Sequence, residues 1–181
     1  MGALLLIYFV LPNNFFLVLP KEDILLLALA AVWVLEGIRL TAHFELPMIR
    51  PYEERRVASY AFYGTALVGA VLIFPEPIAA AVILGTALVD PIAGELRRSS
   101  SHRNLYPALP YVAYVALAIL GLSAIGGWPI LWAVPLAALA GIVALAAEYP
   151  NVPWIDDDLT MTFVPAIVLY AVGVLVLRLP A

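Results

Sequence analysis

Long apolar runs dominate this chain and leave little room for a water-soluble fold. The runs cover residues 3–19, 24–42, 58–74, 77–95, 107–125, 128–147 and 160–178. Because about 20 apolar residues form a helix that crosses the hydrocarbon core of a bilayer, each run has roughly the length of one span. The sequence therefore predicts an all-α, polytopic transmembrane helical bundle that forms a single integral-membrane domain over residues 1–181.

The composition supports this prediction and excludes several functional classes. Of the 181 residues, 65% are hydrophobic and 12% are charged, whereas roughly 25% are charged in a soluble domain. A soluble enzyme or a nucleic-acid-binding domain of this size would leave too much apolar surface uncovered. Cysteine is absent, which excludes disulfides, thiolate zinc sites and iron–sulfur clusters. Lys21, the single lysine, does not belong to a G-x-x-x-x-G-K-[ST] phosphate-binding loop.

Six of the seven runs are predicted to be transmembrane helices, and the first run is left open. Pro12, Asn13 and Asn14 lie in the middle of 3–19. Two amide side chains and a missing backbone donor need polar partners at that depth, so this run either spans or forms a broken, re-entrant element. The prediction is therefore six to seven spans. Small residues four positions apart, such as Ala137 and Gly141, predict close helix packing.

The distribution of basic residues predicts how the bundle is oriented. Because successive spans alternate in direction, the loops at 39–56, 97–106 and 148–159 are predicted to share one face. This face carries seven of the nine basic residues: Arg39, Arg50, Arg55, Arg56, Arg97, Arg98 and Arg103. By the positive-inside rule, the arginine-rich face is predicted to be cytoplasmic.

Most acidic residues are predicted to lie on the same face. They are Glu45, Glu53, Glu54, Glu95, Glu148, Asp156, Asp157 and Asp158. A Mg²⁺–nucleotide site would use both kinds of charge, since arginines bind phosphates and carboxylate oxygens bind Mg²⁺. The alternative is a solvated rim of surface ion pairs, each contributing ~0–1 kcal/mol. The sequence leaves both interpretations open.

Asp90 is the most informative single residue. It follows the apolar run 79–89, which places it inside a predicted span, on the order of 7 Å deeper than Glu95. An ionisable side chain within a membrane segment costs ~2.5–3.5 kcal/mol and commonly marks a functional site. Pro91 cannot donate to the carbonyl of Ala87, so a kinked helix with a free acceptor beside the carboxyl group is expected. The alternative is a buried aspartate paired with an arginine of another helix.

Three consecutive carboxyl groups, Asp156-Asp157-Asp158, precede the last span. Acidic residues stabilise a helix start, and one aspartate can cap the free backbone N–H groups. Capping accounts for one or two acids rather than three. Since adjacent carboxylates repel one another, a bound cation or an arginine between them is the alternative explanation.

Other polar and aromatic residues fit structural roles. Glu36 and Arg39 have the i, i+3 spacing of a local ion pair on a helix. Trp128 and Trp154 lie at the ends of predicted spans, where tryptophans commonly form an interfacial belt.

The order of the charged motifs resembles that of a known enzyme family. The motifs are Glu36-x-x-Arg39, Arg50-x-x-Glu53, Asp90-Pro91-x-Ala93, Glu148-x-Pro150 and Asp156-Asp157-Asp158-Leu159-Thr160. Over roughly residues 24–175, the chain resembles the CTP-dependent polyprenol kinases, which include dolichol and phytol kinases. The last motif is the most specific, because it is similar to an acidic-acidic-Asn-Leu-Thr run before the family's last helix. The chain departs from the family at Val89, where a glycine is usual, and has no Lys-[Ser/Thr]-x-Glu-Gly segment.

The resemblance implies a divergent integral-membrane phosphotransferase that moves the γ-phosphoryl group of CTP, or of another nucleotide, to an isoprenoid alcohol. In this hypothesis Asp90 binds Mg²⁺ or accepts the hydroxyl proton. The metal would be held by Asp90, Asp156, Asp157 and Asp158, and the phosphates by Arg50, Arg55, Arg97 and Arg103.

Two alternatives stay open at this point. One is a cytidylyltransferase-like lipid enzyme, which would use the same nucleotide and metal with a lipid phosphate as acceptor. The other is a non-enzymatic membrane protein, either a small transporter or a structural partner in a complex. The charge-poor opposite face, with Glu22, Asp23 and Glu76 at loop edges, favours a one-sided site over a pathway through the membrane. The sequence also leaves homo-oligomerisation open.

Overall fold

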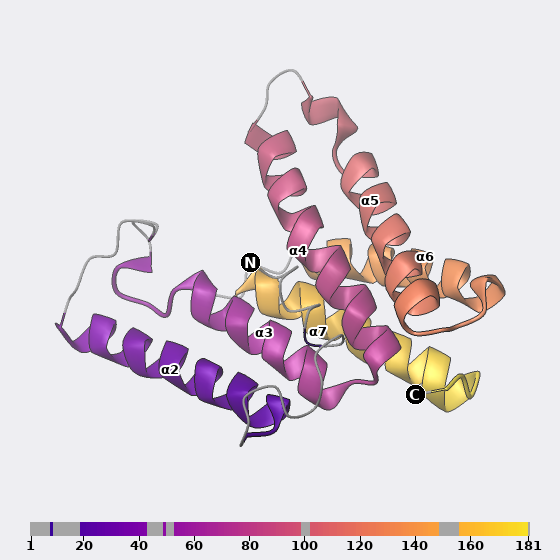
Figure 1. Cartoon of the computed structure of the whole chain (residues 1–181). Helices are drawn as coiled ribbons and strands as arrows, with labels where there is room; N and C mark the ends of the chain where they lie inside the picture. The colour runs from indigo at the N-terminus through magenta and orange to yellow at the C-terminus, as the bar shows by residue number, and fades with distance from the viewer. Residues whose placement is uncertain are drawn as a thin grey trace.

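The structure is a computed structural model that describes residues 8, 19–42, 49, 53–98, 102–148 and 156–180. Its elements are all helical (Figure 1): α2 (Lys21–Ala42), α3 (Ser59–Ile73), α4 (Glu76–Arg98), the short 3-10 helix η3 (Arg103–Leu105), α5 (Ala108–Ile119), α6 (Ile130–Ala147) and α7 (Asp157–Leu169). Two helices continue into wider π-helical ends, α5 into η4 (Leu120–Ile125) and α7 into η5 (Tyr170–Val176).

Five of these helices are long and apolar enough to cross a membrane. They are α2, α4, α5 with η4, α6, and α7 with η5. The all-helical prediction is therefore confirmed, and the apolar helices indicate a membrane protein. The run 58–74 forms α3, whose 15 residues extend only about 22 Å. Most of the run 3–19 lies outside the described residues.

Helix α4 is the centre of the bundle. Every residue from Pro77 to Thr86 is buried, which means that this half of the helix is enclosed on all sides. It packs against α3, α5 and α7, and Figure 1 shows α5 running beside it while α7 crosses it. The charged residues of α4 lie outside this enclosed half, and Asp90, four residues beyond it, is half-buried.

Small residues allow the helices to approach one another closely. A Cβ atom at Gly121 in η4 would lie 2.5 Å from the backbone of Ala81 in α4, so only glycine fits there. In α6 the residues Ala137, Ala140, Gly141 and Ala144 are buried, which confirms the predicted small-residue packing. Small side chains of this kind are typical of helix contacts in membranes.

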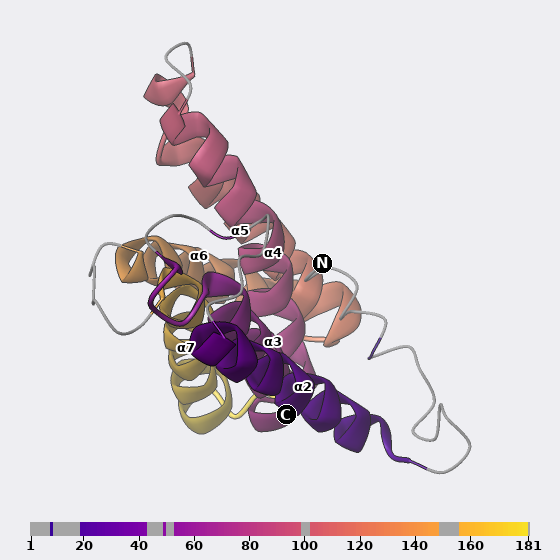
Figure 2. The same cartoon turned by 90° about the vertical axis from the view of Figure 1, so that its left-hand side faces the viewer.

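Helix α2 lies at the edge of the bundle beside α3 (Figures 1 and 2). Its only two buried residues are charged, Glu36 and Arg39. They form the predicted i, i+3 ion pair, with Arg39 Nη2 2.7 Å from Glu36 Oε1. Most of its apolar side chains are exposed, and its contacts with α3 also include the Trp33 ring, which packs edge-on against Phe62 and donates to the Thr65 hydroxyl at 3.0 Å.

The helix boundaries differ from the predictions at two functionally important ends. Helix α4 ends at Arg98 rather than at 95, and α7 begins at Asp157 rather than at 160. Pro91 does not end α4. Basic residues in a last turn and acidic residues in a first turn are both favourable for a helix dipole, which accounts for the extra turns.

The interpretation of Trp128 as part of an interfacial belt was wrong. Its side chain is 2% exposed, and its indole Nε1–H donates to the carbonyl of Pro180 at 2.7 Å. A ring enclosed in this way packs on η5, where Gly173 leaves room for it. Trp154 lies outside the described residues.

Candidate functional site

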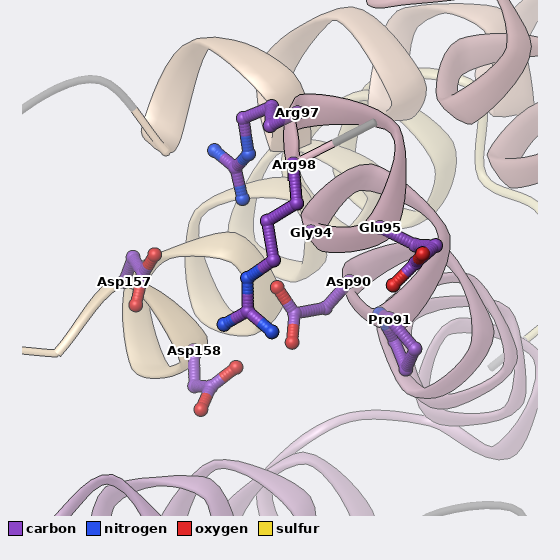
Figure 3. A pocket seen from close by; sticks show the side chains of 8 residues that line it. All are labelled: Asp90, Pro91, Gly94, Glu95, Arg97, Arg98, Asp157 and Asp158. Atoms are coloured by element: carbon purple, nitrogen blue, oxygen red, sulfur yellow. The ribbon is translucent and has the colours of Figure 1, made fainter. Parts of the chain in front are cut away.

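An open cleft of about 530 Å³ lies where the C-terminal half of α4 meets the first turn of α7 (Figure 3). Its lining residues are mostly charged: Asp90, Pro91, Gly94, Glu95, Arg97, Arg98, Asp157 and Asp158. The fold thus brings Asp90 together with Asp157 and Asp158, which precede the last predicted span, in one cleft. Asp90 lies on α4, so its prediction inside an apolar helix is confirmed.

Helical periodicity sets the α4 side of the cleft. Asp90, Gly94 and Arg98 are spaced by four residues, so they follow one another along one face of the helix. Gly94 has no side chain to fill the space between the two charged groups, and a Cβ there would meet nothing within 4 Å. Asp90 is half-buried and lies about 12 Å along the axis from Arg98.

Asp156 caps helix α7. One of its carboxylate oxygens, Oδ1, accepts from the backbone N–H of Asp158 at 3.3 Å. The other, Oδ2, accepts from the hydroxyl of Ser59 at 2.6 Å. The capping interpretation is therefore correct for Asp156, while Asp157 and Asp158 in the first turn line the cleft.

The carboxyl groups are close enough to act on one ligand. One oxygen from each of Asp156, Asp157 and Asp158 can lie within 4.8 Å of the others, a spacing suitable for a shared metal ion. Asp90 also interacts electrostatically with Asp157. Like charges at this spacing repel one another, so a cation bound among them would relieve the repulsion. Hard carboxylate oxygens are the donors that Mg²⁺ prefers.

The arginines do not all take the places that the sequence predicted. Arg97 lines the cleft, but its guanidinium also pairs with Glu148 at the C-cap of α6. Tyr106 donates to the same carboxylate at 3.1 Å. Arg55 is exposed in the turn before α3 and does not line this cleft. Arg50 and the side chain of Arg103 lie outside the described part of the chain.

Arg98 is the basic residue that reaches furthest into the cleft. Figure 3 shows its guanidinium extending into the space between Asp90 and Asp158. Arg98 was predicted on the charged face but not among the phosphate-binding residues. The eight-residue spacing from Asp90, which is two steps of four along one helix face, was the signal that would have identified it, once α4 was known to continue through Pro91.

A second group of polar side chains, which the sequence did not predict, joins α3 to the acidic segment. The Ser59 hydroxyl lies 2.5 Å from Glu53 Oε1 and 2.6 Å from Asp156 Oδ2. Glu53 itself is 3% exposed. A serine at the start of an apolar helix has no strong sequence signal, although helix alternation predicted that the loops at 39–56 and 148–159 share one face.

Comparisons of the chain with protein-family models, with curated proteins and with solved structures find no match. The functional interpretation therefore rests on the chemistry of the cleft.

Proposed function

We propose that this protein is a polytopic membrane phosphotransferase of the polyprenol kinase type, which transfers the γ-phosphoryl group of CTP to an isoprenoid alcohol. The observation that carries the proposal is the shared cleft, in which Asp90 of α4 meets Asp157 and Asp158 of α7 beside the Arg98 guanidinium. Phosphoryl transfer depends mainly on positioning and charge neutralisation, and this set of residues suits both tasks.

Mg²⁺ would be held by Asp90, Asp156, Asp157 and Asp158. The fit rests on the donor set, since the aspartate oxygens of the α7 start can lie within 4.8 Å of one another. When bound, Mg²⁺ neutralises negative charge that develops on the transferring phosphate. The protein's contribution is to hold these carboxylates on two helices that cross at a fixed place.

The nucleotide phosphates would lie against the arginine side of the cleft. Arg98 extends into the cleft, and Arg97 lines it. Guanidinium groups bind phosphate oxygens through paired, charge-assisted hydrogen bonds. A volume of about 530 Å³ lies within the range of ordinary small-molecule sites, roughly 300–1,000 Å³.

The isoprenoid alcohol would approach from the lipid with its hydroxyl group at the cleft. In the reaction, the alcohol oxygen forms a bond to the γ-phosphorus, and the bond from that phosphorus to the leaving CDP oxygen breaks. The hydroxyl proton passes to Asp90. The half-buried position of Asp90 on an apolar helix supports this step, because a lipid hydroxyl would reach such a carboxylate without leaving the membrane boundary.

The topology in this proposal has six spans, with α3 as the shortest, or seven if residues 3–19 also cross. The arginine-rich helix ends would face the cytoplasm by the positive-inside rule. The cleft would then open toward the cytoplasmic nucleotide pool.

An assay with purified protein tests the proposal. γ-Labelled CTP is incubated with farnesol, geranylgeraniol, phytol or dolichol, with and without Mg²⁺, and the lipid fraction is analysed for label. Mg²⁺-dependent label in a lipid monophosphate supports the kinase. A parallel assay with α-labelled CTP and a lipid phosphate tests the cytidylyltransferase alternative, because only that reaction leaves the nucleotide moiety on the lipid. No transfer in either assay would favour a non-enzymatic membrane protein.

A further inference from the structure

Ser59, the first residue of α3, connects the acidic start of α7 to a buried carboxylate. Its hydroxyl lies 2.6 Å from Asp156 Oδ2 and 2.5 Å from Glu53 Oε1, and its backbone N–H donates to the same Glu53 oxygen at 3.1 Å. A serine hydroxyl has only one proton to donate. Because the backbone N–H already serves Glu53, the hydroxyl proton can be directed to Asp156. Ser59 can therefore fix the orientation of that carboxylate.

The turn before Ser59 is held by a buried guanidinium. Arg39, 4% exposed, donates to the carbonyls of Glu53 at 3.2 Å, Glu54 at 3.4 Å and Arg56 at 2.6 Å. Three carbonyls of one short segment are thus bound by one side chain. This fixes the path of the backbone that leads into α3.

The carboxylate of Glu36 completes the arrangement. It accepts two hydrogen bonds from Arg39, at 2.7 and 2.8 Å, and one from the backbone N–H of Ala58 at 2.7 Å. The hydroxyl of Tyr60 donates to the same carboxylate. Glu36 thus binds the residues on both sides of Ser59. Burial of this ion pair is costly, so its role is better explained by geometry than by net stabilisation.

We propose that Ser59 is a positioning residue for Asp156 in the metal site, and that the Glu36–Arg39 pair holds Ser59 in place. This inference rests on the proposed metal-dependent function. Groups that hydrogen-bond to a carboxylate ligand fix its orientation, and their loss typically weakens metal binding about 10- to 100-fold. Helix α2, although it lies at the edge of the bundle, thereby acts on the cleft through α3.

Mn²⁺ binding to the purified protein tests the inference without any activity assay. Mn²⁺ serves as a paramagnetic probe for the Mg²⁺ site. The concentration of free Mn²⁺ is measured by electron paramagnetic resonance, and bound Mn²⁺ is obtained by difference. Ser59→Ala is expected to weaken binding about 10- to 100-fold. Ser59→Thr, which keeps the hydroxyl, should retain binding near the wild-type value. Arg39→Lys should also weaken binding, since a lysine cannot reproduce the guanidinium's fixed set of donors.

Ser123→Ala is the matched control. The Ser123 hydroxyl bonds to the Ile119 carbonyl at 2.6 Å in the α5–η4 helix, away from the cleft, so Mn²⁺ binding should not change. If Ser59→Ala lowers thermal stability but binds Mn²⁺ as tightly as the wild type, the positioning role is overturned while the metal site stands. If Arg39→Lys binds normally, the part assigned to the Glu36–Arg39 pair is overturned. A wild-type protein that binds no Mn²⁺ would overturn both this inference and the metal-dependent function.

Discussion

Asp90 of α4 and Asp157 of α7 lie on opposite sides of one cleft, and their carboxyl groups interact electrostatically across it (Figure 3). The two residues belong to helices that are separated in the chain by α5 and α6. Their meeting depends on the crossing of α4 and α7, which also brings Asp158 and Arg98 into the same space. The proposed chemistry depends on this relationship more than on any single residue.

Replacing Asp90 tests its role as metal ligand and proton acceptor. Asp90→Asn keeps the size of the side chain but removes its charge, so it should lower phosphoryl transfer about 100-fold or more. The measurement is the rate of label transfer from CTP to a lipid alcohol at saturating Mg²⁺. Asp23→Asn, an exposed aspartate at the other end of the bundle, is the control and should retain activity. Unaltered turnover by Asp90→Asn would remove Asp90 from the mechanism.

Arg98 is expected to bind the nucleotide phosphates. Arg98→Gln removes a charge-assisted contact worth about 1.5–3 kcal/mol, so the KM for CTP should rise roughly 10- to 100-fold. Arg178→Gln, an exposed arginine beyond η5, is the matched control and should leave KM unchanged. A KM for CTP that stays the same in Arg98→Gln would show that the phosphates bind elsewhere.

The buried Glu36–Arg39 pair predicts a large effect on stability. Glu36→Ala leaves the Arg39 guanidinium buried without its carboxylate, which should lower the free energy of unfolding by about 3–5 kcal/mol. The measurement is a denaturant titration in detergent, followed by helical circular dichroism. Glu76→Ala changes an exposed glutamate in the first turn of α4 and should cost far less. A loss below about 1 kcal/mol for Glu36→Ala would show that the pair behaves like a surface ion pair.

The absence of cysteine from the chain makes the orientation in the membrane directly testable. Arg55→Cys introduces a thiol in the exposed turn before α3, and Glu76→Cys introduces one at the opposite end of the bundle. With a membrane-impermeant maleimide, Arg55→Cys should react only in inverted vesicles and Glu76→Cys only in right-side-out vesicles. The reverse pattern would place the cleft on the external side and contradict the positive-inside prediction.

Much of the fold could be predicted because membrane insertion imposes strong rules on sequence. The apolar runs predicted the bounds of α2, α4 and α6, of α5 with η4, and of α7 with η5, to within a few residues. The alternation of helices also predicted correctly that the C-terminal half of α4 and the start of α7 lie on one side. Exact helix ends were less predictable, because Pro91 and the terminal charged residues are compatible with either a loop or a continuing helix.

The site could be predicted in part for a similar physical reason. A carboxyl group within an apolar run is costly, and that cost identified Asp90 from the sequence alone. Which arginine reaches the cleft depends on helical phase and on competing partners, as the pairing of Arg97 with Glu148 illustrates. The hydrogen bonds of Ser59 depend on tertiary packing of α3 against α7, about which a single serine in the sequence carries no information.

Cleavage of the protein by bound iron tests most directly whether the two helices share one metal. Fe²⁺ is allowed to replace Mg²⁺ in purified protein, and ascorbate with peroxide then generates radicals that cut the backbone close to the ion. We predict cuts near both Asp90 and Asp157 in the same sample, suppressed by excess Mg²⁺ and lost in Asp90→Asn. Cuts near Asp157 alone that persist in Asp90→Asn would contradict a metal site shared by α4 and α7.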